Sequence, residues 1–182
     1  TQSITTLVIP ANAKDAAVDF SQPNMEYLII PRHENTRAIS ADANGKVTLQ
    51  NIDRTDDAQR WTIQEDGNAY TIKNAVGQLL TAQRATDNNT LVAQTHSADE
   101  QTFYIENVDP IYVKILSTLD SEYAFDLTEE KTASDTRVGL WTYNTSTSPT
   151  HRQWMLFPLP TDAPDANKEL QNEQSGEHNK EN

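Results

Sequence analysis

The chain has 182 residues, of which 36% are hydrophobic and none is Cys, and its 27 acidic and 14 basic residues give a formal net charge of -13. This length fits one domain of ordinary size, and the lack of Cys excludes a disulfide framework, a thiolate metal cluster and a cysteine nucleophile. The negative charge disfavours nucleic acid as a partner, and no apolar run approaches the roughly 20 residues of a membrane span, which excludes membrane insertion.

Residues 1–23 precede the main predicted domain. Their apolar run from Ile4 to Ile9 is expected to form an extra strand packed on that domain, with a disordered arm as the alternative. A chain without Cys suits the cytoplasm and also secretion without disulfides, so the compartment stays open between the two.

Between residues 24 and 159, short β-branched and aromatic runs alternate with turn residues such as Asn44-Gly45 and Asp66-Gly67-Asn68. No stretch of a dozen residues has helical periodicity, so the pattern predicts an all-β domain. Closely spaced short strands of this kind are typical of a closed barrel or a sandwich. Twelve strands are expected, at Tyr27–Ile30, Ala38–Ala41, Lys46–Ile52, Gln59–Gln64, Asn68–Lys73, Gln78–Gln83, Thr90–His96, Gln101–Val108, Ile111–Leu116, Tyr123–Thr128, Arg137–Asn144 and Arg152–Leu159.

Internal repetition favours the barrel, because the twelve strands fall into three groups of four that align with one another. The closing aromatic residues of the groups are expected to fill the barrel interior near a pseudo-threefold axis. The first residue of each closing triplet is expected to hydrogen-bond the backbone of its own repeat's long loop. The triplets are Gln59-Arg60-Trp61, Gln101-Thr102-Phe103 and Arg152-Gln153-Trp154.

These three copies of about 40 residues, each ending in a polar-x-aromatic triplet, resemble the ricin B-type β-trefoil lectin domain, whose signature is a repeated Gln-x-Trp. The resemblance covers residues 24–159 and extends to fungal-type members without Cys, although Arg152 replaces Gln in the third copy. It implies a β-trefoil of three four-stranded repeats with pseudo-threefold symmetry. It also implies carbohydrate binding without a cofactor, with glycans or glycoproteins as partners and galactose-type sugars favoured.

Two positions of the third repeat differ from their counterparts in a way that predicts a sugar site. Trp141 aligns with Gln in both other repeats, a pattern that indicates a solvent-facing position, so Trp141 is expected to be exposed. Asp126 stands where the other copies have the hydroxyl residues Ser40 and Thr81. The resemblance implies that this Asp clamps sugar hydroxyls and that this Trp stacks on the sugar ring, and both side chains suit that chemistry.

Neighbouring residues extend the predicted site. Tyr143 and Asn144 follow Trp141 and are expected to add a side wall or a further hydrogen bond. The third repeat is the longest, and its extra residues, at 128–136 and 144–150, are expected to wall a shallow pocket. The first and second repeats lack both the Asp and the aromatic residue and are expected to bind no sugar.

A structural role for Asp126 stays open beside the sugar site. The Asn-Gln pair that the family places beside the sugar is His151-Arg152 here, and Gly139 stands where many family sites have a polar residue. Arg152 could form an ion pair with Asp126, which would make Asp126 a structural residue and Trp141 a packed one.

Other patterns in the chain do not predict further chemistry. The segment Ser40–Gly45 is similar to the start of a calcium loop, but Asn51 stands where a bidentate Glu is needed, so a β-hairpin turn is the better interpretation. The four His are scattered over different repeats and the C-terminal segment, which predicts no metal site. The nucleophile and phosphate-binding motifs of common enzymes do not occur, so no enzyme is predicted.

Two other functions remain alternatives. The first is a β-trefoil protease inhibitor, similar to the cysteine- and serine-protease inhibitors of mushrooms, which would bind a protease partner through exposed loops. The second is a trefoil that binds other proteins without any small ligand. A lectin needs Asp126 and Trp141 on one surface, whereas an inhibitor does not.

Residues 160–182 differ in composition from the rest of the chain. They contain one branched aliphatic residue, Leu170, and no aromatic residue. Such a segment cannot bury enough apolar surface to offset the entropy cost of ordering it, so it is predicted to be a disordered acidic tail.

Overall fold

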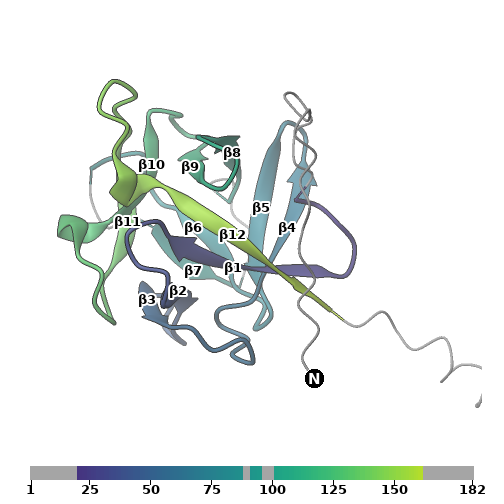
Figure 1. The fold of residues 1–182 in the computed structure, drawn as a ribbon. Helices are drawn as coiled ribbons and strands as arrows, with labels where there is room; N and C mark the ends of the chain where they lie inside the picture. The colour runs from purple at the N-terminus through teal and green to yellow at the C-terminus, as the bar shows by residue number, and fades with distance from the viewer. Residues whose placement is uncertain (1–19, 88–90, 96–100, 162–182) are drawn as a thin grey trace, which may run out of the picture.

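The computed structural model describes residues 20–87, 91–95 and 101–161, in which twelve strands and two short 3-10 helices are found (Figure 1). Each strand overlaps one of the predicted ranges, so the all-β prediction is confirmed. The strands are β1 (Met25–Pro31), β2 (Arg37–Ala41), β3 (Val47–Asn51), β4 (Trp61–Asp66), β5 (Ala69–Asn74), β6 (Leu79–Ala82), β7 (Leu91–Gln94), β8 (Phe103–Asn107), β9 (Val113–Ser117), β10 (Tyr123–Leu127), β11 (Val138–Thr142) and β12 (Trp154–Pro160).

The two 3-10 helices are η1 (Thr128–Glu130), which follows β10, and η2 (Thr150–Arg152), which precedes β12. Neither is long or apolar enough to cross a membrane. The predicted extra strand from Ile4 to Ile9 and nearly all of the predicted tail, from residue 162 on, lie outside the described residues.

Six strands close into a barrel. β1 pairs with β12 and β4, β5 pairs with β4 and β8, and β9 pairs with β8 and β12, all antiparallel. Figure 1 shows β1 in purple running beside β12 in yellow-green. The remaining strands form three hairpins, β2–β3, β6–β7 and β10–β11. Each repeat thus supplies two barrel strands and one hairpin, which is the predicted β-trefoil, and closure leaves the barrel without an open edge.

The three repeated aromatic residues lie in the core, as predicted. Trp61, Phe103 and Trp154 are fully buried in one apolar cluster. The indole N–H of Trp61 donates to the carbonyl of Ile39 at 3.0 Å, and that of Trp154 donates to the carbonyl of Phe125 at 3.1 Å. Both carbonyls sit at the same position of β2 and β10, so each indole ties the hairpin of its own repeat to the barrel.

The folded core includes a residue that precedes the expected start of the trefoil at residue 24. Phe20 is buried and packs edge-on against the rings of Tyr27 and Tyr70, with centroid distances of 6.1 and 6.2 Å. Such edge-to-face contacts are a favoured arrangement of aromatic rings. Phe20 therefore joins the core before β1 begins.

The turn between β2 and β3 is the predicted hairpin turn. The side-chain oxygen of Asp42 accepts hydrogen bonds from the backbone N–H groups of Asn44 and Lys46, both at 2.9 Å. Gly45 has a φ of 81°, in the left-handed region that favours glycine. Its carbonyl accepts from the N–H of Ala93 at 2.9 Å, which links this hairpin to β7 of the second repeat.

Replacing Gly45 with alanine is expected to lower the free energy of unfolding by about 2–3 kcal/mol. A Cβ at this position would lie 2.2 Å from the carbonyl oxygen of Ala93, in addition to the cost of the left-handed backbone. Gly67→Ala is the matched control, because Gly67 also has a positive φ but has open space around it. In urea denaturation, Gly45→Ala should have a clearly lower free energy of unfolding than Gly67→Ala. Equal losses would contradict the close approach of residue 45 to the carbonyl of Ala93.

Candidate functional site

The register of the β10–β11 hairpin brings the two main predicted site residues together. Asp126 pairs with Gly139, and Ala124 pairs with Trp141. Alternate residues of a strand share one face, so Asp126 and Trp141 project from the same side of the hairpin. Gly139 adds no side chain between them, which leaves room for a hollow.

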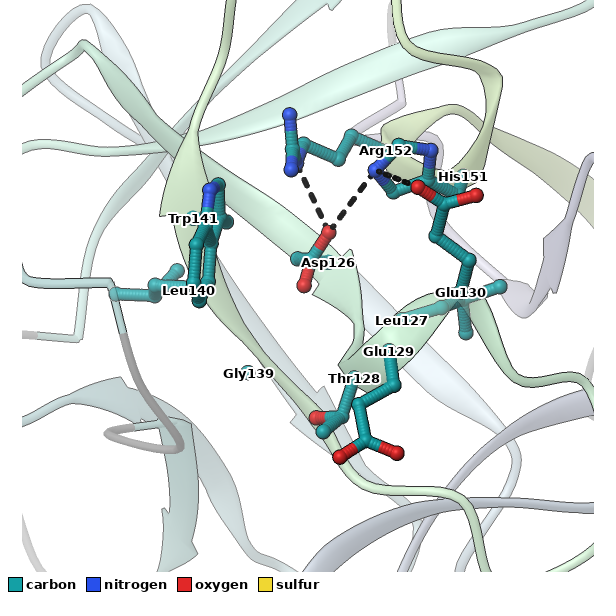
Figure 2. Close-up of a pocket in the computed structure, with 10 residues that line it drawn as sticks. All are labelled: Asp126, Leu127, Thr128, Glu129, Glu130, Gly139, Leu140, Trp141, His151 and Arg152. Carbon is teal, nitrogen blue, oxygen red and sulfur yellow. Dashed lines mark hydrogen bonds and ion pairs between the residues drawn. The ribbon is translucent and has the colours of Figure 1, made fainter.

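A pocket of about 520 Å³ occupies this face (Figure 2). Trp141 is 44% exposed beside it, so the predicted exposure of this residue is confirmed. Of the two long loops expected to wall the pocket, 128–136 supplies Thr128 to Glu130, whereas no residue of the loop 144–150 lines it. The lining residues are Asp126, Leu127, Thr128, Glu129, Glu130, Gly139, Leu140, Trp141, His151 and Arg152.

Asp126 is buried and forms an ion pair, the arrangement that the sequence left open as an alternative. Nε of Arg152 donates to Oδ1 of Asp126 at 2.8 Å, and Nε2 of His151 lies 3.6 Å from the same oxygen. Oδ2 accepts no hydrogen bond from the described residues, and in Figure 2 the second carboxylate oxygen points away from Arg152 and His151. One oxygen of the carboxylate therefore remains for a ligand.

The electrostatic environment of the pocket shifts the pKa values of two groups. Burial raises the pKa of Asp126 to about 6, against the opposing effect of Arg152 and with smaller contributions from the negative charges of Glu130 and Asp87. Burial and Arg152 lower the pKa of His151, and Glu130, 3.7 Å away, opposes that shift. At neutral pH the pocket thus holds an ionised Asp126 and a neutral His151.

In the first two repeats, the first residue of the closing triplet contacts its own repeat. Nε2 of Gln59 donates to the carbonyl of Asn51 at 2.9 Å, and its side-chain oxygen accepts from the N–H of Asp53 at 3.2 Å. The predicted loop contact is thus confirmed for Gln59. Gln101 donates to the hydroxyl of Thr81 in β6, at 3.2 Å.

The prediction that Arg152 holds the backbone of the third loop is wrong. The guanidinium turns to Asp126, and Gln153 contacts the loop instead, donating to the carbonyl of Ser148 at 3.4 Å and to the hydroxyl of Tyr143 at 3.0 Å. Helix η2 ends at Arg152, and the extended residue that follows, Gln153, is almost fully buried. The loop contact has moved by one position along the chain.

Tyr143 and Asn144, which the sequence predicts beside the sugar, do not line this pocket. They line a separate hollow of about 400 Å³ together with Lys114 and Glu122. The N–H of Tyr143 donates to the carbonyl of Glu122 at 2.6 Å, which continues the β10–β11 pairing past Thr142 and places Tyr143 beyond Trp141, on the side away from Asp126. The side-chain oxygen of Asn144 holds the following turn.

Sequence reasoning included the pocket residues Thr128 and Glu130 only as part of the loop 128–136. They come from the left-handed turn after β10, where Glu129 and Glu130 have φ values of 56° and 57°. The available signal was the length of this loop, which no spacing rule converts into a direction for each side chain. Among the described residues, no group of three or more acidic or His side chains could hold a metal ion.

The matching face of the first repeat also forms a hollow, of about 570 Å³. Its lining includes Ser40, Gln50 and Gln59 at the positions of the Asp, the Trp and the Arg of the third repeat. The third repeat is therefore distinguished by a charge pair and an aromatic side chain, and not by the presence of a hollow.

The closed barrel with its three hairpins defines the chain as a β-trefoil. Residues 57–141 match the family model described as "Ricin-type beta-trefoil lectin domain-like". The resemblance to ricin B-type lectin domains that the repeats indicated is thereby confirmed. No curated protein matches the chain.

Solved structures with the same fold include a designed protein and fungal lectins. The designed 3-fold symmetric protein ThreeFoil has a TM-score of 0.64 at 19% identity, over 74% of this chain and 99% of ThreeFoil. The Macrolepiota procera ricin B-like lectin in complex with lactose has a TM-score of 0.63 at 21% identity, over 78% of this chain and 99% of that lectin. The Polyporus squamosus lectin, bound to Neu5Aca2-6Galb1-4GlcNAc, has a TM-score of 0.60 at 20% identity, over 74% of this chain and 49% of that lectin.

Proposed function

We propose that this protein is a lectin-like, non-catalytic carbohydrate-binding module whose sugar site is the pocket between Asp126 and Trp141. The match to a lectin-like family model and the lectins of the same fold support carbohydrate binding in general. The observation that carries the specific site is a half-exposed Trp on the same hairpin face as a buried carboxylate with one oxygen left for a ligand.

The chemistry of the pocket suits a single sugar ring. The indole of Trp141 can cover the apolar C–H face of a hexose, while Oδ2 of Asp126 accepts a hydrogen bond from a hydroxyl. Galactose-type sugars are the first choice, since the Macrolepiota procera lectin of the same fold is in complex with lactose. The site is shallow, and its hydrogen bonds to a sugar only replace those that the sugar makes with water. A monosaccharide should therefore bind with a Kd of about 0.1–10 mM. Cross-linking of glycoproteins or cells would require an oligomer, because one site per chain cannot bridge two of them.

Replacing Trp141 with alanine is expected to weaken lactose binding at least about tenfold, because the stacking surface is lost. NMR titration with lactose measures this, and the binding shifts in the wild-type protein should centre on Trp141 and its strand neighbours. Gln94→Ala is the matched control, because Gln94 holds the equivalent position of the second repeat. It should leave the lactose titration unchanged.

A different outcome would favour the inhibitor alternative. If no glycan shifts the signals around Trp141, and the protein inhibits a member of a panel of cysteine and serine proteases, the lectin proposal fails. Asp126→Ala separates the two functions further, because it should abolish sugar binding and have no effect on inhibition through exposed loops.

A further inference from the structure

The guanidinium of Arg152 lies in the pocket near both the carboxylate of Asp126 and the indole of Trp141 (Figure 2). Its Nε bonds to Oδ1 of Asp126 at 2.8 Å, and its central carbon lies 5.9 Å from the centroid of the Trp141 ring. Both Nη groups lack a hydrogen-bond partner within the described residues, and Arg152 lines the pocket. The protein thus presents unused donors beside its stacking surface.

The side chain of Arg152 does not hold the loop that precedes β12. Gln153 contacts that loop, whereas in the first repeat the residue matching Arg152 does so. The arginine is therefore available to act within the pocket. It places a donor group where the first two repeats have a neutral amide that contacts its own repeat.

The charges around Arg152 decide which acceptor it can recognise. Asp126 offsets the charge of the guanidinium, and Glu129 and Glu130 also line the pocket. An anionic sugar such as a uronate would meet three carboxylates and one guanidinium, with His151 neutral. The pocket should therefore favour an uncharged hydrogen-bond acceptor that is stronger than a hydroxyl. The carbonyl oxygen of an amide is such an acceptor.

Building on the proposed sugar site, we propose that Arg152 is its specificity-determining residue and selects N-acetylhexosamines over the corresponding plain hexoses. The acetamido carbonyl accepts a hydrogen bond from an Nη group of Arg152, and an adjacent sugar hydroxyl donates to Oδ2 of Asp126. The ring and the acetamido methyl group lie against Trp141. The pocket thus places a hydrogen-bond donor, Arg152, beside an acceptor, Asp126. This pair matches a sugar that carries an acetamido group next to a hydroxyl.

The test compares methyl β-galactoside with its N-acetylgalactosamine counterpart, titrated by NMR into wild-type protein and Arg152→Gln. The wild-type protein should bind the N-acetyl sugar about tenfold more tightly, as expected for one hydrogen bond to a charged donor. Arg152→Gln, which introduces the residue of the other two repeats, should bring the two affinities within about twofold of each other. Binding of the plain galactoside should weaken as well, because loss of the guanidinium raises the pKa of Asp126 further, but the binding that remains should still depend on Trp141.

Arg152→Lys provides a second variant in case the glutamine leaves Asp126 unpaired and unfolds the protein. Lysine keeps the positive charge, and its compact ammonium group should pair with Asp126. It has no second edge of N–H groups, as the guanidinium has, that could donate to the sugar at the same time. It should therefore also lose the preference for the N-acetyl sugar. Thermal melts of both variants establish that they are folded.

Several outcomes would overturn the inference. An unchanged N-acetyl preference in folded Arg152→Gln would refute the role of Arg152, while Trp141-dependent binding in the same titration would preserve the proposed function. Tighter binding of both sugars by Arg152→Gln would show that the arginine obstructs the pocket, and a preference of the wild-type protein for methyl galacturonide would show that it recognises anions. Lack of binding of all three sugars to the wild-type protein would refute the proposed function as well.

Discussion

Replacing Trp61 with alanine is expected to lower the free energy of unfolding by about 3–5 kcal/mol, the usual cost of removing a large buried aromatic side chain. Trp61 is fully buried, and its indole N–H donates to the carbonyl of Ile39. The substitution leaves a cavity in the barrel and a buried carbonyl without its partner. Urea denaturation at neutral pH gives this value directly.

Two further variants make the Trp61 result specific. Trp141→Ala should cost less than about 1 kcal/mol, because that side chain is half-exposed. Trp61→Phe keeps most of the ring but removes the indole N–H, so its loss should fall between the other two. Equal losses for Trp61→Ala and Trp141→Ala would contradict the assignment of one Trp to the core and the other to the surface.

Sugar affinity is expected to fall about tenfold for each pH unit below about 6, and roughly 100-fold by pH 4. The pKa of Asp126 is raised to about 6, mainly by burial, so its carboxylate takes up a proton in this range. Protonation removes the charged acceptor that the sugar hydroxyl needs and weakens the pair with Arg152. Titration of lactose at a series of pH values measures the effect.

The same group affects stability in the opposite direction. The folded-state pKa of Asp126 exceeds the ordinary value of 3.8, so between about pH 4 and pH 6 the folded state binds more protons than the unfolded state. Its contribution to the free energy of unfolding therefore increases as the pH falls through this window, and above pH 6 the buried ionised form lowers stability. Acidification should weaken binding while Asp126 itself favours folding.

Asp126→Asn isolates both effects. Carboxyl groups with a lowered pKa, such as Asp53 and Asp109, change the stability with pH in the opposite sense. Their contributions cancel when the unfolding free energy of Asp126→Asn is subtracted from that of the wild-type protein. The wild-type protein should gain stability relative to Asp126→Asn as the pH falls from 7 to 4. A wild-type affinity that stays constant over the same range would show that the ionised carboxylate plays no part in binding.

The fold could be predicted because its determinants repeat. Trp61, Phe103 and Trp154 recur in phase, and each must be buried in an equivalent way for three repeats to share one core. The exposure of Trp141 could be predicted for the same reason, since the other two repeats reveal which face of that strand meets water. Repetition provides two internal comparisons for every position.

The site could be predicted only in part, because it lies where the third repeat departs from the other two. The sequence suggested both a free Asp126 and one paired with Arg152, and the outcome depended on the short helix η2, which gives the loop contact to Gln153. Tyr143 was expected in the site because it lies just beyond Trp141 in the chain, but the β10–β11 pairing continues to it and carries it along the strand away from Asp126. Where no internal copy exists, spacing does not fix the direction of a side chain.

The pairing of β1 with β12 along seven residue pairs has a consequence for how this protein folds. The barrel closes only when residues 154–160 join a strand made more than a hundred residues earlier in synthesis, so closure cannot precede the emergence of β12 from the ribosome. Contacts of such long sequence separation slow folding, because a large loop must be ordered before they form. Until then β1 and β9 each lack a neighbour, and in the nascent chain these are the strands most open to pairing with another molecule.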